Sequence, residues 1–80
     1  MKKFPSQFVD PFAPVQSRVG HRLGWMRVDL GLTQEMLSSL SGVTQADISR
    51  YENHRSLPSI ATAKKLARAL KCDFRVLVPF

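Results

Sequence analysis

The stretch from Leu32 to Leu57, LTQEMLSSLSGVTQADISRYENHRSL, contains two short helical patterns on either side of one glycine. Thr33 is a residue type that favours the N-cap of a helix, and Leu37 and Leu40 follow it at helical spacing. Gly42 then interrupts the pattern, because glycine adopts the left-handed conformation that ends a helix at little cost. The sequence therefore predicts a first helix that begins after Thr33 and ends near Gly42.

A second helix is predicted to begin after Thr44, which is again a favoured N-cap residue. Its apolar residues Ile48 and Tyr51 lie three positions apart and therefore share one side of the helix. Two helices joined by a tight glycine turn form a helix-turn-helix, here over residues 33–53. The other side of the second helix carries Gln45, Asp47, Ser49, Arg50 and Asn53. We expect this polar side to read DNA, because the second helix of such a motif enters the major groove.

The composition indicates one small, basic domain. The 80 residues include 12 Lys and Arg against six Asp and Glu, which gives a net charge of +6 and a pI near 10.3. Such a charge suits a polyanionic partner, nucleic acid before membrane. No apolar run approaches the ~20 residues of a membrane span, and the N-terminus lacks the apolar core of a signal peptide. We therefore expect a reduced, cytoplasmic compartment. The single cysteine, Cys72, excludes an internal disulfide framework.

Residues 1–16 form the first segment, which we predict to be an extended arm. The segment contains three of the five prolines and three phenylalanines, namely Pro5, Pro11, Pro14, Phe4, Phe8 and Phe12. Proline at this density forbids a helix and disfavours a central strand. The phenylalanines are too frequent for a pure linker. The alternatives are an arm that packs on its own domain, on a second subunit or on another protein, and a frayed tail.

The helix-turn-helix domain is predicted to span residues 17–71, and its first helix runs from the cap residue Ser17 to about Leu30, with Gly31 as its end. Four apolar residues fall on one stripe of this helix, at Val19, Leu23, Met26 and Leu30. Trp25 lies on another side among polar neighbours. We expect the phenylalanine-bearing arm or a partner to cover it.

The last helix of this domain is predicted to start at Ser59. Its apolar stripe consists of Ile60, Ala63, Leu66, Ala67 and Leu70. The opposite side carries Lys64, Lys65, Arg68 and Lys71. Cations near a helix C-terminus suit the helix dipole, so we interpret these four residues as a solvated face.

Residues 72–80 form a separate C-terminal segment, in which Phe74, Val76, Val78 and Phe80 alternate with other residues. An alternation of period two favours a strand. A single strand lacks a partner within its own chain, so its expected mate is the same strand of a second copy, in a two-stranded antiparallel ribbon. The competing interpretation is a short fifth helix that is capped by Asp73 and buries Phe74 and Leu77. Both interpretations predict a homodimer, with Phe74, Val76 and Val78 at its interface.

Taken together, residues 19–77 resemble the Cro/C1-type, or xenobiotic-response-element (XRE) type, helix-turn-helix DNA-binding domain. The matching pieces are Arg27, Gly31 to Glu35, Leu37, Ser41 to Gln45, Ile48 to Asn53, Pro58 and Leu66 to Leu70. The resemblance implies an all-α fold, a compact lambda-repressor-like domain of four to five helices. It also implies that Glu52 meets Arg27 across the domain as a structural ion pair.

Three residues depart from the family pattern, one of which, Ala46, belongs to the expected DNA contacts given below. Ser38 stands where the family usually has Ala, and a hydroxyl fits there if it bonds back to a carbonyl. His54 stands where Gly is common, so either Asn53 or His54 is expected in the left-handed conformation. The arm and the C-terminal segment also resemble those of the antitoxin subgroup, whose members dimerise, bind a toxin protein and repress their own operon.

The expected DNA contacts fall into two groups. Gln45, Ala46, Ser49 and Arg50 are expected to meet base edges: glutamine pairs with adenine, arginine with guanine, and alanine touches a thymine methyl. The phosphate contacts are expected from Gln34, Thr44, Asn53 and Arg55. A dimer would place two such helices about 34–36 Å apart, which predicts a pseudo-palindromic target in double-stranded DNA.

The function predicted from the sequence is a dimeric, sequence-specific repressor that binds double-stranded DNA. The alternative is an antitoxin-type or adaptor protein whose main role is to bind another protein, since fold does not guarantee function. An enzyme is not expected, because His21 and His54 lack a suitably spaced carboxylate or cysteine and no phosphate-binding glycine loop is present. We accordingly expect neither a cofactor nor a metal.

Overall fold

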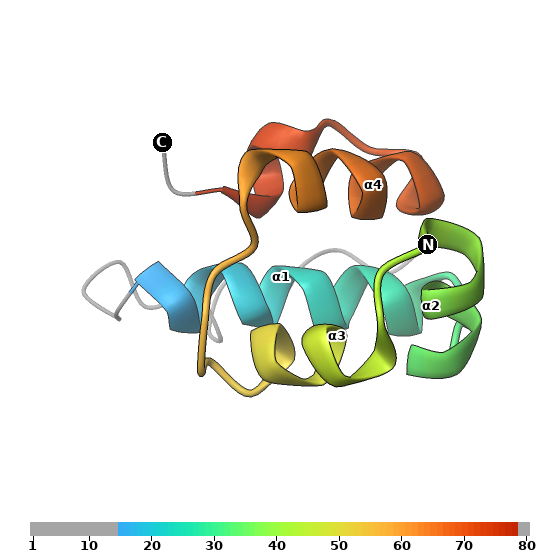
Figure 1. The fold of residues 1–80 in the computed structure, drawn as a ribbon, viewed down its shortest axis with the longest axis horizontal. Helices are drawn as coiled ribbons and strands as arrows, with labels where there is room; N and C mark the ends of the chain where they lie inside the picture. The colour runs from blue at the N-terminus through green and yellow to red at the C-terminus, as the bar shows by residue number, and fades with distance from the viewer. Residues whose placement is uncertain (1–14, 79–80) are drawn as a thin grey trace.

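The computed structural model describes residues 15–78, and these residues form five helical elements (Figure 1). The elements are α1 (Val15–Asp29), α2 (Gln34–Ser41), α3 (Gln45–Glu52), α4 (Ile60–Leu70) and the 3₁₀ helix η2 (Phe74–Leu77). No strand occurs in this range. The prediction of an all-α fold with four to five helices is therefore confirmed. The predicted arm lies outside the described residues, apart from its last two positions, which begin α1.

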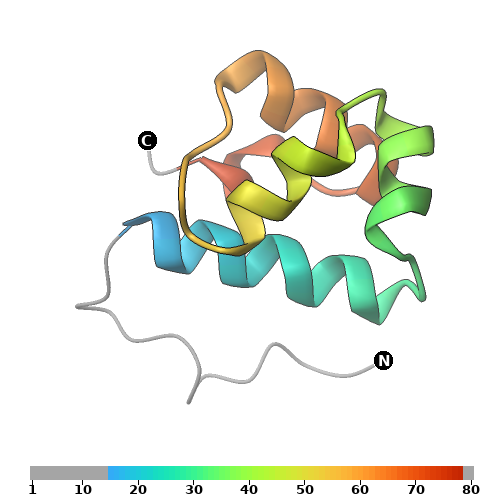
Figure 2. The ribbon, with the colours of Figure 1, turned by 60° about the horizontal axis from the view of Figure 1, so that its bottom comes forward.

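The long helix α1 spans the molecule, and two of the other elements pack directly on it. It packs against α3 and η2, while α2 packs against α3 and α4, and α4 against η2. Figure 1 shows α4 above α1 and α3 below it, and Figure 2 shows α3 lying over the middle of α1 and α2 near the C-terminal end of α1. Of the two helices of the motif, α3 is thus supported by α1, and α2 is supported by α4.

Each element contributes at least one large, fully buried side chain to a single core, which explains why such short helices hold together. These side chains are Leu23, Leu37, Ile48, Leu66 and Leu77, all with no exposed surface. Helices of eight residues, such as α2 and α3, are unstable alone in water and depend on this tertiary packing.

The caps of the helices follow from local sequence and agree with the predictions. The Oγ1 atom of Thr33 accepts a hydrogen bond from the backbone N–H of Met36 at 3.0 Å. Thr44 and Ser59 cap α3 and α4 in the same way. Gly42 ends α2 with a φ of 79°, in the left-handed region. After α3 it is His54, with a φ of 64°, that takes the left-handed conformation.

Three leucine or isoleucine positions of the expected apolar stripes are exposed instead of buried. Leu30 lies beyond the end of α1, in the turn that Gly31 completes, and Ile60 is the first residue of α4. Leu40 is on α2, but its side chain is 62% exposed because only the Leu37 side of this short helix faces the core.

The predicted C-terminal strand is wrong, and the competing interpretation, a short helix, is the observed one. Asp73 caps η2 by accepting a hydrogen bond from the backbone N–H of Arg75 at 3.0 Å. Leu77 is fully buried and Val78 is buried beside it, while Phe74 is only half-buried against the core. Helix η2 packs on α1 and α4 of its own chain. The segment therefore buries apolar side chains against its own chain, without a second strand.

Candidate nucleic-acid interface

Helix α3 has one buried side and one exposed side. Ile48 and Tyr51 are buried against the rest of the domain. Gln45, Ala46 and Arg50 are exposed. Ser49, the fourth residue expected to contact bases, is half-buried. The structure thus brings the expected base-reading residues together on one face, with the first turn of α3 open to solvent.

The polar side chains on this face bond to one another. The Arg50 guanidinium forms an ion pair with the carboxylate of Asp47, one turn earlier in α3. The Nδ2 atom of Asn53 donates to the Oγ atom of Ser49 at 3.1 Å. These bonds reduce the number of conformations that the face adopts, which lowers the entropy lost when such side chains bind a partner.

The residues expected to contact phosphates lie at the ends of α2 and α3. Thr44 precedes α3, and Asn53 and Arg55 follow it in exposed positions. Gln34 is the first residue of α2, where the backbone N–H groups have no acceptor within the helix. Its side chain is half-buried and donates from Nε2 to Oε1 of Glu52 at 3.2 Å. Gln34 therefore links α2 to the end of α3.

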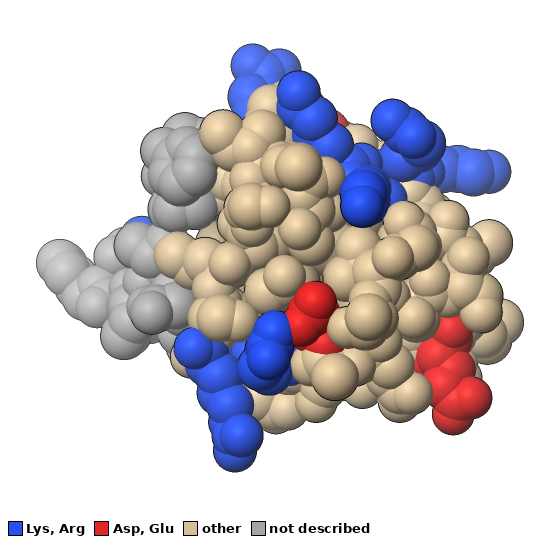
Figure 3. Space-filling view, in the orientation of Figure 1, with Lys and Arg blue, Asp and Glu red and all other residues tan. Residues whose placement is uncertain are grey.

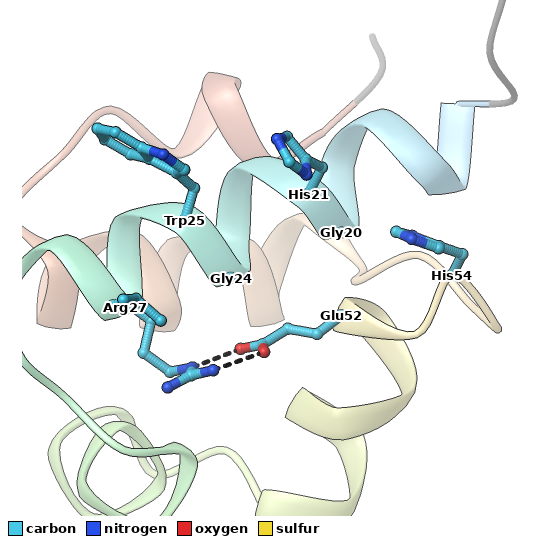
Figure 4. Close-up of a pocket in the computed structure, with 8 residues that line it drawn as sticks. Gly20, His21, Gly24, Trp25, Arg27, Glu52 and His54 are labelled. Atoms are coloured by element: carbon cyan, nitrogen blue, oxygen red, sulfur yellow. Dashed lines mark hydrogen bonds and ion pairs between the residues drawn. The ribbon is translucent and has the colours of Figure 1, made fainter. Parts of the chain in front are cut away.

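Glu52 also binds Arg27 of α1 (Figure 4). The Nε atom of Arg27 donates to Oε2 of Glu52 at 2.7 Å, and Nη2 donates to Oε1 at 2.9 Å. A third donor, Nη1, bonds to the carbonyl oxygen of Leu32 at 2.7 Å. The hydrogen bond to Glu52 raises the pKa of the Arg27 guanidinium, although burial opposes this increase. The pair fixes α3 relative to α1 and to the start of α2.

Two glycines of α1 allow α3 to approach closely. A Cβ atom on Gly20 would lie 2.2 Å from the carbonyl oxygen of Tyr51, closer than any side chain permits. In Figure 4, Gly20 and Gly24 lie on the side of α1 that faces Glu52. Together with His21 and Trp25, they border a shallow groove. The glycines thus set the distance between α1 and the exposed helix.

Positive charge flanks the face of α3. Figure 3 shows Lys and Arg gathered over α4 and in a second group over the end of α3 and the loop that follows. The surface between the groups is uncharged apart from one acidic side chain beside the second group. The exposed cations of these elements are Lys64, Lys65, Arg68, Arg50 and Arg55. A strip with little charge between two basic edges is suited to a polyanion with two charged strands.

Comparison with known proteins agrees with this geometry. Residues 23–77 match the HTH_3 helix-turn-helix family. The chain belongs to this family, the Cro/C1-type regulators. The family consists of DNA-binding regulators, so the prediction that the chain is not an enzyme is confirmed.

Relatives of this Cro/C1-type chain include regulators of different lengths. The HTH-type transcriptional repressor RghR of Bacillus subtilis is 45% identical over 60 residues, which are 74% of this chain and 44% of that protein. The controller protein C.AhdI of a restriction-modification system of Aeromonas hydrophila has a TM-score of 0.74 at 33% identity, covering 79% of this chain and 96% of that one. An HTH_3 family regulator of Vibrio cholerae has a TM-score of 0.73 at 31% identity, covering 78% and 35%. The chain spans less than half the length of the first and third of these.

Other kinds of site are not seen in the described part of the chain. Residues 15–78 contain no group of three His, Cys, Asp or Glu side chains that could hold a metal ion. None of the helices in this range is long and apolar enough to cross a membrane. Burial raises the pKa of the Cys72 thiol, which disfavours the reactive thiolate.

Sequence reasoning did not identify two contacts. The bond from Gln34 to Glu52 joins positions 18 residues apart, and no local pattern indicates it. The ion pair of Asp47 with Arg50 does have a local signal, because opposite charges three positions apart on a helix lie side by side. The helical pattern places Asp47 on the polar side of the helix but does not by itself indicate a role for it.

Proposed function

We propose that this chain is a sequence-specific repressor that inserts α3 into the major groove of double-stranded DNA. The observation that carries the proposal is the exposed row of Gln45, Ala46 and Arg50 on a helix whose opposite side is buried. The repressor function named for the Bacillus relative supports repression rather than activation. We place such a role in the cytoplasm, where the DNA is accessible.

The dimensions of α3 suit this role. Its eight residues extend about 12 Å at 1.5 Å per residue, comparable with the ~12 Å width of the major groove. We assign Gln45 to adenine and Arg50 to guanine, because the amide and the guanidinium match the paired donor and acceptor atoms of these bases. Ala46 would touch a thymine methyl, and Ser49 would complete the edge.

The phosphate contacts we propose are on either side of this row. Thr44 and Gln34 lie at helix N-termini, where backbone N–H groups attract anions. Asn53 and Arg55 lie at the other end of α3. Contacts of this kind set the position of the protein on the duplex and carry no sequence information of their own.

We further propose that two copies bind one pseudo-palindromic site, with their α3 helices about 34–36 Å apart. The half-buried side chains of Phe74 and Val76 are available for the interface, whereas Val78 is buried in its own core. The contact surface would therefore be formed by helices, because the strand that was expected here is absent.

Selection of bound duplexes from a random pool, at two salt concentrations, tests the proposal. We expect one enriched pseudo-palindrome, and a salt dependence that reports the number of phosphates neutralised. Gln45→Ala and Arg50→Ala should each lose ~1–3 kcal/mol of discrimination at one base position. Arg68→Ala, on α4, is the matched control for the loss of an exposed cation. Equal, weak retention of all duplexes by the wild-type chain would contradict the proposal.

The same variants distinguish the alternative, an antitoxin-type or adaptor protein that acts by binding another protein. Such a protein would keep its function when Gln45 and Arg50 are replaced, since neither side chain supports the core. A repressor would lose its operator under the same replacements while retaining its fold.

A further inference from the structure

Asp47 and Arg50 form an ion pair on the outer face of α3, where the Nη2 atom of Arg50 donates to Oδ1 of Asp47. The backbone of Asp47 is itself held in the first turn, because its N–H donates to Oγ1 of the cap residue Thr44 at 3.2 Å. The Asp47 side chain is 34% exposed and that of Arg50 is 56% exposed. Both groups therefore lie on the face that α3 would turn toward DNA.

General affinity for DNA does not explain the Asp47 carboxylate. The net charge of +6 attracts phosphates, and a negative charge on the approaching face opposes that attraction for every duplex. Stability explains little of it either, because exposed ion pairs contribute little to the free energy of unfolding. The dipole of a helix does favour an acidic residue in the first turn. Glu35 holds that place in α2 with no ion pair among the described residues, which makes it a matched comparison.

A group that weakens binding to all DNA can still increase specificity. Specificity is the difference between the affinities for two sequences, so it increases when binding to the wrong sequence is lowered more than binding to the right one. A guanidinium has five N–H donors in a fork, and its pair with Asp47 uses one of them. The remaining donors can bind O6 and N7 of guanine.

We propose that Asp47 is a positioning residue that determines specificity by holding the Arg50 guanidinium over the base edges and away from the phosphates. Without Asp47, the long side chain of Arg50 would be free to turn to a phosphate, which every sequence offers. This inference rests on the proposed function, because it presupposes that α3 reads DNA.

The test compares the wild-type chain with Asp47→Asn, Arg50→Ala and the double variant. Binding is measured to the selected duplex, to duplexes in which each guanine in turn is replaced by adenine, and to an unrelated duplex. For Asp47→Asn we expect the preference for guanine at one position to fall by roughly fivefold or more. Binding to the unrelated duplex should become tighter by a few-fold, with a steeper salt dependence, because one negative charge is lost. Glu35→Gln loses the same charge and should keep the base preference.

The double variant separates positioning from direct reading by Asp47. Arg50→Ala and the double variant should show the same base preference, because Asp47 acts only through Arg50. An unchanged preference in Asp47→Asn would overturn the inference, even if its melting temperature fell, since that result indicates a purely structural role. A base preference in the double variant that differs from that of Arg50→Ala would also overturn it. A wild-type chain with no base preference would overturn the proposed function itself.

Discussion

Arg27 and Glu52 join α1 to α3 through two parallel hydrogen bonds, of 2.7 and 2.9 Å. The same two residues also bind the segment around the start of α2, because Arg27 donates to the carbonyl of Leu32 and Glu52 accepts from Gln34. One ion pair therefore connects three helices at the base of the face that we propose for DNA. The orientation of this face therefore depends on the ion pair.

Replacing Glu52 with Ala should destabilise the domain strongly. Removal of one partner from a buried pair costs ~3–5 kcal/mol, and we expect about 3 kcal/mol because the two side chains keep 15% and 11% of their exposure. Urea denaturation measures the free energy of unfolding. The double variant Arg27→Met/Glu52→Leu should lose less free energy of unfolding than Glu52→Ala alone, since no unpaired charge remains. A midpoint of urea unfolding for Glu52→Ala equal to that of the wild type would contradict this prediction.

Gly20→Ala should destabilise the domain, although the same change within a helix ordinarily stabilises it by up to ~1 kcal/mol. The new Cβ atom would lie 2.2 Å from the carbonyl oxygen of Tyr51, so α1 and α3 must move apart. Overpacking of this kind costs about 1–3 kcal/mol. The matched control is Gly24→Ala, whose Cβ atom would meet only the Glu52 side chain, at 3.3 Å. Equal melting temperatures of the two variants would contradict the close approach.

Leu37→Ala and Leu40→Ala should differ widely, although both residues belong to the same short helix. Leu37 is fully buried, so its truncation leaves a cavity that costs ~2–5 kcal/mol. Leu40 is 62% exposed, and its truncation should change the free energy of unfolding by less than ~0.5 kcal/mol. Thermal and urea unfolding of both variants provides the measurement. A large loss for Leu40→Ala would show that a partner or another segment covers it.

The stability supplied by Asp73 should depend on pH. Hydrogen bonds from the Arg75 side chain, and then from its backbone N–H, lower the pKa of Asp73 from 3.8 to about 2. Because the pKa is lower in the folded state, the stabilisation is fully present above pH 3.8 and is lost as the pH falls through about 2. The melting temperature of Asp73→Asn should therefore approach that of the wild type over this interval. A difference that stays constant from neutral pH to about 2 would contradict the prediction.

The C-terminal segment shows where local pattern was insufficient. The alternation of Phe74, Val76 and Val78 is typical of a strand, but a strand is stable only if another strand pairs with it. Residues 15–71 instead offer an apolar surface on α1 and α4, and burial of Leu77 there favours the 3₁₀ helix. The alternation could not reveal this surface, because its residues lie far away in the chain.

The sequence by itself determined the helix-turn-helix, because the caps Thr33 and Thr44, the turn at Gly42 and the spacing of Ile48 and Tyr51 all act within one or two turns of helix. It also indicated the polar side of α3, since helical periodicity separates that side from the buried one.

Only the tertiary structure decided which apolar residues lie inside, how closely α1 approaches α3 at Gly20, and where the chain ends its last helix. Each of these features depends on atoms that are distant in sequence. Burial and steric contact act through space, so the short-range periodicity of the sequence does not determine which surface a side chain will contact.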